Sequence, residues 1–345
     1  MNNNTIFQEA TIIDALKKLN NLPSLQTLFV FDNKNKVVGT LTDGDIRRGL
    51  IQGYRLDTSI SKIMFTNFNY LTKDKNEFSK LKTFREKRLK AVPLLDSEKR
   101  LIKIYNFTKI KSILPIDAVI MAGGKGIRLM PLTQNTPKPL LKVGNKEIIA
   151  YNFDRLYQYG ITNQHITVNY LAEQISDYCN NYSKDINFNL VHEPKLLGTA
   201  GALTLIKNFK NDTILLMNSD LLTNMDYEDF YKTFIEKEAD MLVASIPYKV
   251  NLPYAVFDTD NGYVKSLKEK PTYTHYINTG IYLLKKELLS MLPQNKAYNA
   301  TDFMEDIIKA KKELIHYPIR TYWLDIGNHT DFEKAQKDIA HINWE

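Results

Sequence analysis

Apolar and polar positions in the last two thirds of the chain follow two alternating periods. Short apolar runs predict buried strands at DAVIMA (117–122), HITVNY (165–170), FNLVHE (188–193) and TILLMNSD (213–220). Between the first two, residues 147–160 place Ile149, Phe153 and Leu156 on one helical face, and Gly160 marks the end of that helix. Strands that alternate with helices predict a Rossmann-like α/β domain, with a mostly parallel sheet covered by helices on both faces.

The first third has a different pattern, in which two similar segments follow one another. In each segment a helical pattern precedes two strand-like runs that flank a polar turn. The helical patterns are residues 11–20 and 77–89, and the strand pairs span residues 27–42 and 90–106. Such a repeat predicts two α+β units, residues 1–57 and 58–114, that pack face to face. Pro115 lies at the boundary, so we expect the α/β domain at residues 115–345.

In the first repeat, VVGTLTDGDIRRGL (37–50) runs from a strand through a glycine into a turn that opens a helix. This segment resembles a CBS domain, and the resemblance implies a tandem CBS pair that binds an adenosine-type or guanine nucleotide. Thr42 and Asp45 would contact the ribose, and Arg47, with Arg48 as the alternative, would contact the phosphate. The alternative is that Thr42 only caps the helix. The second repeat has Lys103 in place of the glycine, so we expect one competent cleft, or else a module that mediates dimer contacts.

Length and cysteine content narrow the class of protein. A chain of 345 residues is too long for one average core and predicts two domains. The only cysteine, Cys179, excludes an intrachain disulfide framework, and the N-terminus lacks the basic and apolar segments of a signal peptide. No apolar run reaches the ~20 residues that a membrane span needs. We therefore expect a cytoplasmic protein without a membrane partner.

The net charge of +7 is unevenly distributed along the chain. The first 114 residues carry 21 Lys and Arg against 11 Asp and Glu, whereas the remaining residues carry 25 against 28. The basic excess peaks in KLKTFREKRLK (80–90), which is typical of the solvated face of a helix. No zinc-finger, RRM or KH pattern accompanies it, so we expect no nucleic-acid partner. The alternative, a first third that binds nucleic acid, predicts salt-dependent binding.

A glycine-rich segment, AGGKGIRLMPLTQNTPKPLL (122–141), follows the first predicted strand of the α/β domain. It is not a Walker A loop, because Lys125 is followed by Gly126 rather than by Ser or Thr. It is not a dinucleotide fingerprint, because Leu129 occupies the sixth position counted from Gly124, where a glycine is required. The segment resembles the signature of the sugar-1-phosphate nucleotidyltransferases, and the resemblance extends over nearly all of residues 116–345.

This resemblance implies roles for residues in six segments. The nucleotide would be bound by the backbone and side chains of Ala122, Gly123, Gly124, Gly126, Gly198, Thr199 and Gly201. Positive charge for catalysis would come from Arg128, Lys138 and Lys270. The sugar phosphate would be bound by Glu269, Lys270, Asn278 and Thr279. Asp220 and Asp325 would hold Mg²⁺, a hard cation that prefers oxygen ligands. Taken alone, each of these carboxylates is also typical of a turn or helix cap.

The same resemblance implies the reaction. An oxygen of a sugar 1-phosphate would attack the α-phosphorus of a nucleoside triphosphate (NTP), and pyrophosphate would leave without a covalent enzyme intermediate. EPKLLGTAGAL, LPYAVFD and YWLDIGN resemble the mannose-1-phosphate guanylyltransferase branch, so we expect GTP and a hexose or hexosamine 1-phosphate as substrates. A uridylyl- or thymidylyltransferase of the same family and a non-catalytic sensor of nucleotide sugars are the alternatives.

Members of this branch that carry CBS domains act in bacterial surface-glycan pathways. They include the glucosamine-1-phosphate guanylyltransferases of legionaminic acid synthesis. By this resemblance we expect a homo-oligomer that works in surface-glycan synthesis.

Overall fold

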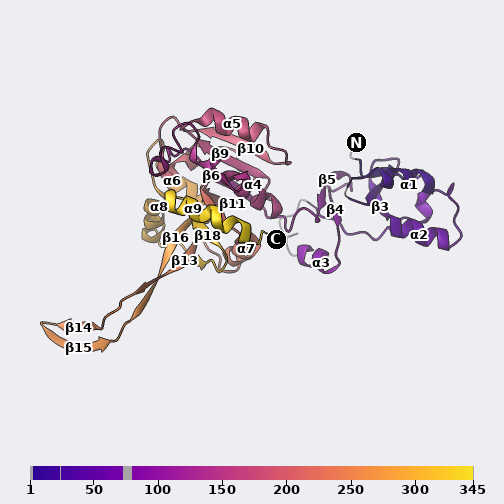
Figure 1. The fold of residues 1–345 in the computed structure, drawn as a ribbon. Coiled ribbons are helices and arrows are strands. Elements are labelled where there is room, and N and C mark those ends of the chain that lie inside the picture. Colours follow the sequence, from indigo (N-terminus) through magenta and orange to yellow (C-terminus); the bar gives the residue numbers. More distant parts are fainter. Residues whose placement is uncertain (1–2, 24, 73–79, 345) are drawn as a thin grey trace. The chain divides into compact units, whose positions relative to one another are not determined.

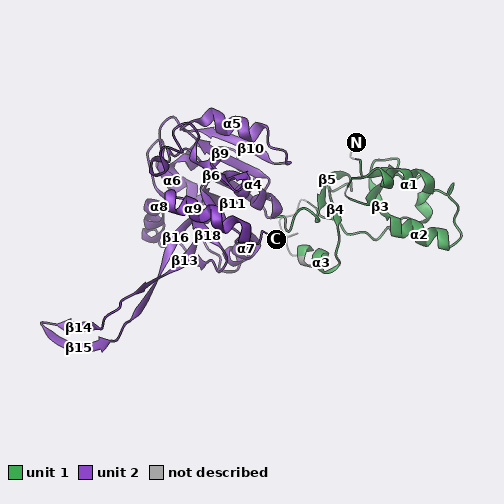
Figure 2. Ribbon diagram, viewed as in Figure 1, with its two compact units in different colours: residues 1–113 green, residues 114–345 purple. Residues whose placement is uncertain are grey.

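The computed structural model describes residues 3–23, 25–72 and 80–344. The described chain forms two compact units, residues 1–113 and 114–345, which have separate colours in Figure 2. Within the described residues, none of the helices combines the length and the apolar character that a membrane crossing requires. Residues 77–79 of the helix predicted at 77–89 lie outside the described residues.

Unit 1 begins with the first predicted repeat. Its elements are β1 (Thr5–Phe7), α1 (Ile12–Asn20), β2 (Thr27–Phe31), β3 (Val37–Thr42) and α2 (Asp43–Ile51). Strand β2 pairs in parallel with β1 and antiparallel with β3. Thr11 caps α1 and Thr42 caps α2, and each cap is completed by the aspartate three residues further on. The apolar face predicted for α1 is buried at Ile12, Ala15 and Leu19.

The second repeat contributes a smaller set of described elements. They are a short 3₁₀ helix (Ile60–Lys62), α3 (Lys80–Glu86), β4 (Ala91–Leu95) and β5 (Leu101–Asn106), and the last two pair antiparallel. The two repeats share an apolar cluster in which Phe29, Val37 and Leu95 are buried. The backbone N–H of Val37 also donates to the carbonyl of Lys99 at 2.9 Å. The two repeats therefore share one apolar interface inside unit 1.

Unit 2 is built on a seven-stranded sheet of order β10-β9-β6-β11-β16-β13-β17 (Figure 1). The strands are β6 (Ile116–Met121), β9 (Asn163–Val168), β10 (Asn187–His192), β11 (Thr213–Asn218), β13 (Met241–Asn251), β16 (Thr272–Lys285) and β17 (Leu314–Pro318). Strands β10, β9, β6 and β11 are parallel, as are β13 and β17, and only β16 runs against its neighbours. The mostly parallel sheet predicted from the alternating pattern is confirmed.

Helices and two small sheets complete unit 2 around the central sheet. The helices are α4 (Ile148–Gln158), α5 (Ala172–Asn180), α6 (Gly198–Gly201), α7 (Tyr227–Glu236), α8 (Ala300–Lys309) and α9 (His329–Asp338). The small sheets pair β7 (Lys142–Val143) with β8 (Lys146–Glu147), and β12 (Leu221–Thr223) with β18 (Trp323–Asp325). Ile149, Phe153 and Leu156 of α4 are fully buried, as their helical spacing predicts, and Gly160 has a φ of 72° just after the helix ends.

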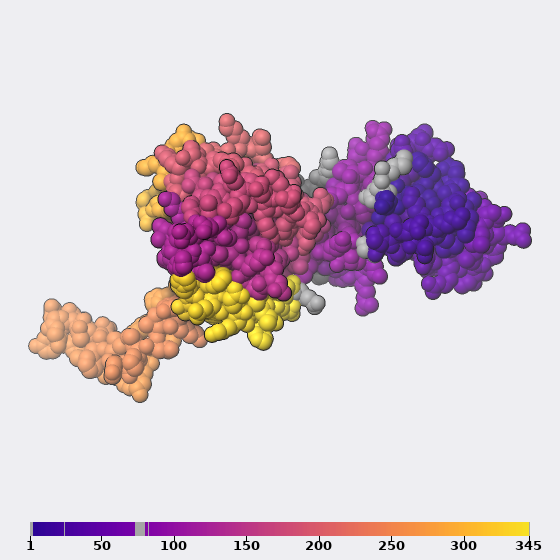
Figure 3. Space-filling model, turned by 45° about the horizontal axis from the view of Figure 1, so that its top comes forward, coloured from indigo at the N-terminus to yellow at the C-terminus, as the bar shows by residue number. Residues whose placement is uncertain are grey.

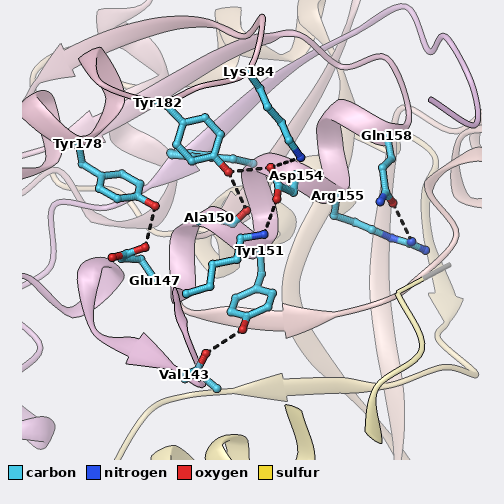
Figure 4. A network of polar contacts seen from close by, with 12 residues as sticks. Val143, Glu147, Ala150, Tyr151, Asp154, Arg155, Gln158, Tyr178, Tyr182 and Lys184 are labelled. Atoms are coloured by element: carbon cyan, nitrogen blue, oxygen red, sulfur yellow. Dashed lines mark hydrogen bonds and ion pairs between the residues drawn. The ribbon is translucent and has the colours of Figure 1, made fainter. Parts of the chain in front are cut away.

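A polar network fixes the outer face of α4 (Figure 4). The Asp154 carboxylate accepts hydrogen bonds from the Tyr182 hydroxyl at 2.7 Å and from Lys184 at 2.5 Å, and it forms an ion pair with Lys146. Burial alone would raise the pKa of Asp154, but these hydrogen bonds outweigh burial and hold the pKa below its ordinary value. The neighbouring Tyr178 hydroxyl donates to Glu147 at 2.8 Å. The network holds in place the helix that supports the pocket described below.

A two-stranded ribbon, residues 247–278, extends from the body of unit 2 and is called the arm below. It continues β13 and β16 outward and ends in the hairpin of β14 (Val256–Asp260) and β15 (Tyr263–Lys268). Figure 1 shows the hairpin well beyond the rest of unit 2, and the space-filling view in Figure 3 shows the same orange extension. None of the arm residues is buried, so the arm has no core of its own.

Candidate active site

A pocket of about 490 Å³ lies where β6 and β11 end. These two strands are the neighbours at which the strand order reverses, because the chain proceeds from β6 to β9 and β10 on one side and to β11 on the other. Ligands of open α/β sheets bind at this point. The pocket lining includes nine residues predicted from the sequence: Ala122, Gly123, Gly124, Gly126, Arg128, Lys138, Gly198, Thr199 and Asp220.

The loop after β6 forms one wall of the pocket from backbone. A Cβ at Gly123 would lie 2.8 Å from Oε1 of Glu193, so a side chain at this position would force the Glu193 carboxylate to move. A Cβ at Gly124 would meet nothing within 4 Å, so the absence of a side chain here widens the pocket. Gly126 has a φ of 62°, and its carbonyl accepts a 2.9 Å hydrogen bond from the Thr133 hydroxyl. Packing against Glu193 therefore favours glycine at position 123, and the open space at Gly124 is available to a ligand.

The opposite wall is the turn that opens α6. Gly198 has a φ of 74°, and a Cβ there would lie 2.8 Å from the backbone oxygen of Tyr298. The Thr199 hydroxyl accepts a 2.8 Å hydrogen bond from the backbone N–H of Ala300, at the start of α8. Gly201 is buried behind the pocket lining, where a Cβ would lie 2.7 Å from a backbone oxygen of the segment before α8. The structure therefore gives Gly201 a packing role.

The two carboxylates predicted to bind metal come from segments of unit 2 that are distant in the sequence. Asp220 lies just after β11, and the carbonyls on either side of it, those of Ser219 and Leu221, accept hydrogen bonds from the Asn152 amide of α4 at 3.3 and 3.0 Å. Asp325 ends β18, and the antiparallel pairing of β18 with β12 places Asp325 opposite Leu221. Helix α4 and the small sheet thus bring Asp220 and Asp325 together.

Nearby cations balance the negative charge of Asp220 more than that of Asp325. Burial raises the pKa of Asp325 to about 6, the Asp220 carboxylate adds to the increase, and Lys138 and Arg128 oppose it. Lys138 also forms an ion pair with Oδ2 of Asp220. Oδ1 of Asp220 and Oδ1 of Asp325 are both buried without a hydrogen-bond donor among the described residues. Two buried carboxylate oxygens without donors are costly unless a cation binds them, so this pair fits a divalent metal.

Two carboxylates leave most positions around a bound cation to water or substrate oxygens. In the part of the chain that the structure describes, no group of three or more His, Cys, Asp or Glu side chains could hold a metal. This donor set is typical of Mg²⁺ and not of a structural zinc site. Mg²⁺ at Asp220 and Asp325 stays a prediction.

Three cationic residues, Lys125, Arg128 and Lys138, line the pocket. Gly327 allows Arg128 to lie close to the loop after β18, because a Cβ at Gly327 would lie 3.3 Å from the guanidinium. Phosphate oxygens of a bound ligand would therefore meet positive charge from the glycine-rich segment and carboxylates from the other side.

The residues predicted to bind the sugar phosphate lie outside this lining. The buried Thr279 hydroxyl donates to a backbone oxygen of β13 at 2.6 Å, and so it contributes to the sheet. The amide of the exposed Asn278 donates to the Tyr282 hydroxyl at 2.8 Å. Glu269 and Lys270 are exposed on the arm. The structure does not bring these four residues to the pocket, and their binding roles stay predictions.

Unit 1 contains a second cleft, of about 520 Å³, lined by residues of both repeats. Thr42 and Asp45 line it, together with Arg48, which was the predicted alternative to Arg47. Successive side chains of a helix point about 100° apart, so only one of the two arginines faces the cleft. The Thr42 hydroxyl lies 2.6 Å from Asp45, and Arg48 forms a 2.6 Å ion pair with Asp45. Thr42 is therefore both the helix cap and a cleft residue.

Sequence reasoning did not single out three residues of the α/β site. Glu193 is buried, and its carboxylate accepts a 3.0 Å hydrogen bond from the N–H of Leu197, which shapes the turn before Gly198. Asn218 lines the pocket at the end of β11. Asn152 supports the Asp220 loop from α4. The sequence did hold a signal for Asn152, because it is a polar residue among the apolar positions of a helix predicted to be buried.

Comparisons with known proteins find a family model that matches part of each unit. A nucleotidyl transferase family model matches residues 117–342, and a CBS domain model matches residues 2–52. The D-glycero-alpha-D-manno-heptose 1-phosphate guanylyltransferase of Aneurinibacillus thermoaerophilus is 30% identical over 66% of this chain and 99% of its own. The catalytic subunit beta of mannose-1-phosphate guanylyltransferase from Dictyostelium discoideum is 29% identical over 62% of each chain.

A solved structure from Bacillus anthracis, assigned as a glucose-1-phosphate thymidylyltransferase, superposes with a TM-score of 0.54. It is 26% identical over 67% of this chain and 97% of that one. The chain spans only 54% to 62% of the length of several other curated relatives that it matches. The relatives named here differ in the base and in the sugar that they use.

Proposed function

The chain belongs to the nucleotidyl transferase family, whose relatives here are sugar-1-phosphate nucleotidyltransferases, and from this premise we propose that it makes a nucleotide sugar from GTP and a hexose or hexosamine 1-phosphate. The observation that carries the proposal is the pair of half-buried carboxylates, Asp220 and Asp325, each with one buried oxygen that lacks a donor among the described residues, beside a glycine-rich loop with Arg128 and Lys138. That arrangement suits a reaction at a phosphorus atom between negatively charged substrates.

In the proposed reaction, an oxygen of the sugar 1-phosphate attacks the α-phosphorus of GTP. A new P–O bond forms, the bond from the α-phosphorus to the bridging oxygen breaks, and pyrophosphate leaves with that electron pair. The attacking phosphate is already ionised near neutral pH, so the reaction needs no general base. Catalysis then consists of positioning and of stabilising negative charge.

The residues of the pocket divide these tasks. The backbone at Gly123 and Gly124 lies against the triphosphate, because neither position has a side chain to keep it away. Arg128 stabilises the leaving pyrophosphate, and Lys138 contacts the transferred α-phosphate. A metal ion held by Asp220 and Asp325 would add positive charge next to the phosphates.

Lys138 connects the acidic pair to the substrate. Its ammonium group forms an ion pair with Asp220 in this structure, and the Lys138 side chain is only 11% exposed. A phosphate that enters the pocket offers Lys138 a second acceptor, while Asp220 would gain the metal as a partner. We therefore expect the ion pair to loosen when substrate and metal bind together.

Guanine is the proposed base because two relatives, which are 29% and 30% identical to this chain, are guanylyltransferases. The proposed pathway is surface-glycan synthesis. Glucosamine 1-phosphate, as used in legionaminic acid synthesis, is one candidate sugar. Four NTPs assayed against a panel of hexose and hexosamine 1-phosphates, with pyrophosphate release as the readout, test both choices. A preference for UTP or dTTP would refute the guanine assignment and leave the reaction class intact.

For unit 1 we propose a regulatory nucleotide site in the cleft lined by Thr42, Asp45 and Arg48. A purine nucleotide would meet a hydroxyl and a carboxylate at its ribose and a guanidinium at its phosphate. Calorimetry on the full chain with AMP, ADP, ATP, GMP and GTP is the test, and Arg48→Ala supplies the cleft variant. If Arg48→Ala leaves every binding isotherm unchanged, the nucleotides bind only at the active site.

A further inference from the structure

A buried amide of α4 lies behind the turn that carries Asp220. Asn152 is 2% exposed, and an amide at such a position is costly unless its hydrogen bonds are satisfied inside the protein. Its NH2 group donates to the carbonyls of Ser219 and Leu221, at 3.3 and 3.0 Å. One side chain therefore holds the backbone immediately before and immediately after Asp220.

The carbonyl of Asp220 itself has a donor from another segment. It accepts a 3.1 Å hydrogen bond from the backbone N–H of Ile326, the residue after Asp325. Residues 219 and 220 form a turn between β11 and β12, so they lie outside the strand ladders. The backbone of this turn is thus held by α4 and by the segment that carries the second carboxylate.

The Asp220 carboxylate depends on this support. Its Oδ2 forms an ion pair with Lys138, whereas its Oδ1 is buried and has no donor from any residue that the structure describes. A short side chain moves with its Cα, so Oδ1 can face a cation only while the backbone of the turn stays in place. Partners that fix the orientation of a metal ligand are typically worth about 10- to 100-fold in metal affinity or activity.

One helical turn further along α4, Arg155 holds the other end of the same segment. The residue is 4% exposed, and its guanidinium donates to the carbonyls of Asn224 and Met225 at 2.7 and 2.9 Å. It also donates to the carbonyl of Trp344 at 3.1 Å. Positions three apart on a helix share a face, so one face of α4 holds residues 219–225 at both ends.

Asn152 and Arg155 differ in what they hold. The Asn152 acceptors flank Asp220, whereas two of the Arg155 acceptors lie four and five residues after Asp220, beyond β12. Loss of either side chain would leave backbone carbonyls without donors, which costs stability. Only the loss of Asn152 would also free the backbone at Asp220 itself.

We propose that Asn152 is a positioning residue for metal binding, because its amide fixes the turn at residues 219–221 so that Asp220 and Asp325 share one cation. Asn152 acts through Asp220 and is not part of the pocket lining. Arg155 stabilises the same segment without this role. The assignment rests on the function and the metal site proposed above, since it gives Asn152 a task in that same site.

Mn²⁺ binding without substrates tests the proposal. Mn²⁺ takes the same oxygen ligands as Mg²⁺, and the electron paramagnetic resonance signal of the free ion gives the bound fraction. Asp325→Asn lacks one predicted ligand, so the binding that this variant loses is the binding in the pocket. Asn152→Leu replaces the amide by an apolar side chain of similar size. We expect it to weaken Mn²⁺ binding in the pocket by about 10-fold or more.

Arg155→Lys is the matched control, because lysine keeps the positive charge but cannot form the same set of hydrogen bonds. Tryptophan fluorescence during heating reports the stability of unit 2 in each variant. Arg155→Lys should lower the melting temperature and leave Mn²⁺ binding and kcat within about twofold of the wild type, whereas Asn152→Leu should lower kcat about 10- to 100-fold. Both rates are measured at the Mg²⁺ concentration that saturates the wild type.

A smaller change covers the case in which Asn152→Leu does not fold. Asn152→Ser replaces the amide by a hydroxyl that cannot reach both carbonyls, and it should weaken Mn²⁺ binding several-fold. If a folded Asn152 variant binds Mn²⁺ as tightly as the wild type, Asn152 has no positioning role. If Arg155→Lys weakens Mn²⁺ binding as much as the Asn152 variants do, the cause is a general loss of stability, and the proposal fails.

Two results separate this role from the proposed function. A wild-type chain that binds no more Mn²⁺ than Asp325→Asn refutes the metal site and the role of Asn152 together, and the assay of pyrophosphate release still decides the reaction class. A wild-type chain that binds Mn²⁺ in the pocket, with the expected effect of the Asn152 variants, but releases no pyrophosphate refutes the proposed function. The positioning role of Asn152 then stands.

Discussion

Replacement of Asp325 by Asn should stabilise unit 2 and inactivate it. In the metal-free protein the pKa of Asp325 is raised from 3.8 to about 6, by burial and by the nearby Asp220 carboxylate. The folded protein therefore holds a proton that the unfolded chain releases, so stability falls as the pH rises through this interval. A shift of about two units corresponds to about 3 kcal/mol by linkage. Because the carboxylate is only partly buried, screening by water reduces this to about 1 to 2 kcal/mol.

Asparagine keeps the shape of the side chain and removes its charge, so Asp325→Asn should escape this penalty at pH 7.5. The melting temperature of unit 2 should rise by about 2–4 °C per kcal/mol. Both tryptophans, Trp323 and Trp344, lie in unit 2, so their fluorescence reports its unfolding. The assay uses a chelator, and Asp258→Asn on the exposed arm is the matched control.

The pH dependence of the difference in melting temperature shows whether the charge of Asp325 is its cause. As the pH falls from 7.5 toward 4.5, wild-type Asp325 gains its proton and the advantage of the Asn variant should shrink. At saturating Mg²⁺ the same variant should lose about 10²–10³-fold in kcat, because a strong electrostatic contributor to the transition state is gone. An equal or lower melting temperature in chelator, or a gain that does not change with pH, would refute the reasoning.

Three further variants or assays test other parts of the account. Gly124→Ala should leave the melting temperature unchanged, since a Cβ there meets nothing within 4 Å, but it should raise KM for the NTP, and an unchanged KM would place the triphosphate elsewhere. Asp154→Asn should cost about 1–3 kcal/mol at pH 7 in urea unfolding. The pKa of Asp154 lies below its ordinary value of 3.8, so the wild-type advantage should disappear as the pH falls below that value, and a constant difference would contradict the ionic origin. Initial rates should favour GTP over UTP, dTTP and CTP, because unpaired polar groups at the base would disfavour the wrong nucleotide.

The strands and helices around the pocket were predictable from local pattern. The run at residues 117–122 is apolar because β6 is buried on both sides, and the glycine-rich loop follows this strand directly in the sequence. Chain order alone also placed Asp220 at the end of a buried strand. These features depend on neighbours in sequence, so the sequence contains their signal.

Other features depend on packing between distant segments. The role of Asn152 requires α4 to lie beside the Asp220 loop, which no local pattern indicates. The choice of Arg48 over Arg47 at the cleft depends on how α2 is rotated. Glu269 and Lys270 were predicted at the sugar side by resemblance, but the ladder of β13 and β16 takes them outward on the arm. Side-chain spacing in the sequence does not determine the direction of a ribbon that lacks a core.

The central claim is that the α-phosphate of the NTP is transferred to a sugar 1-phosphate, and the most direct measurement follows that phosphorus atom. Wild-type enzyme is incubated with [α-³²P]GTP, Mg²⁺ and each candidate sugar 1-phosphate, and products are separated from protein and counted. The account predicts that the label appears in a nucleotide sugar, that unlabelled pyrophosphate forms in equal amount, and that no label stays on the protein. Label recovered only as GMP or GDP, or bound covalently to the chain, would contradict it.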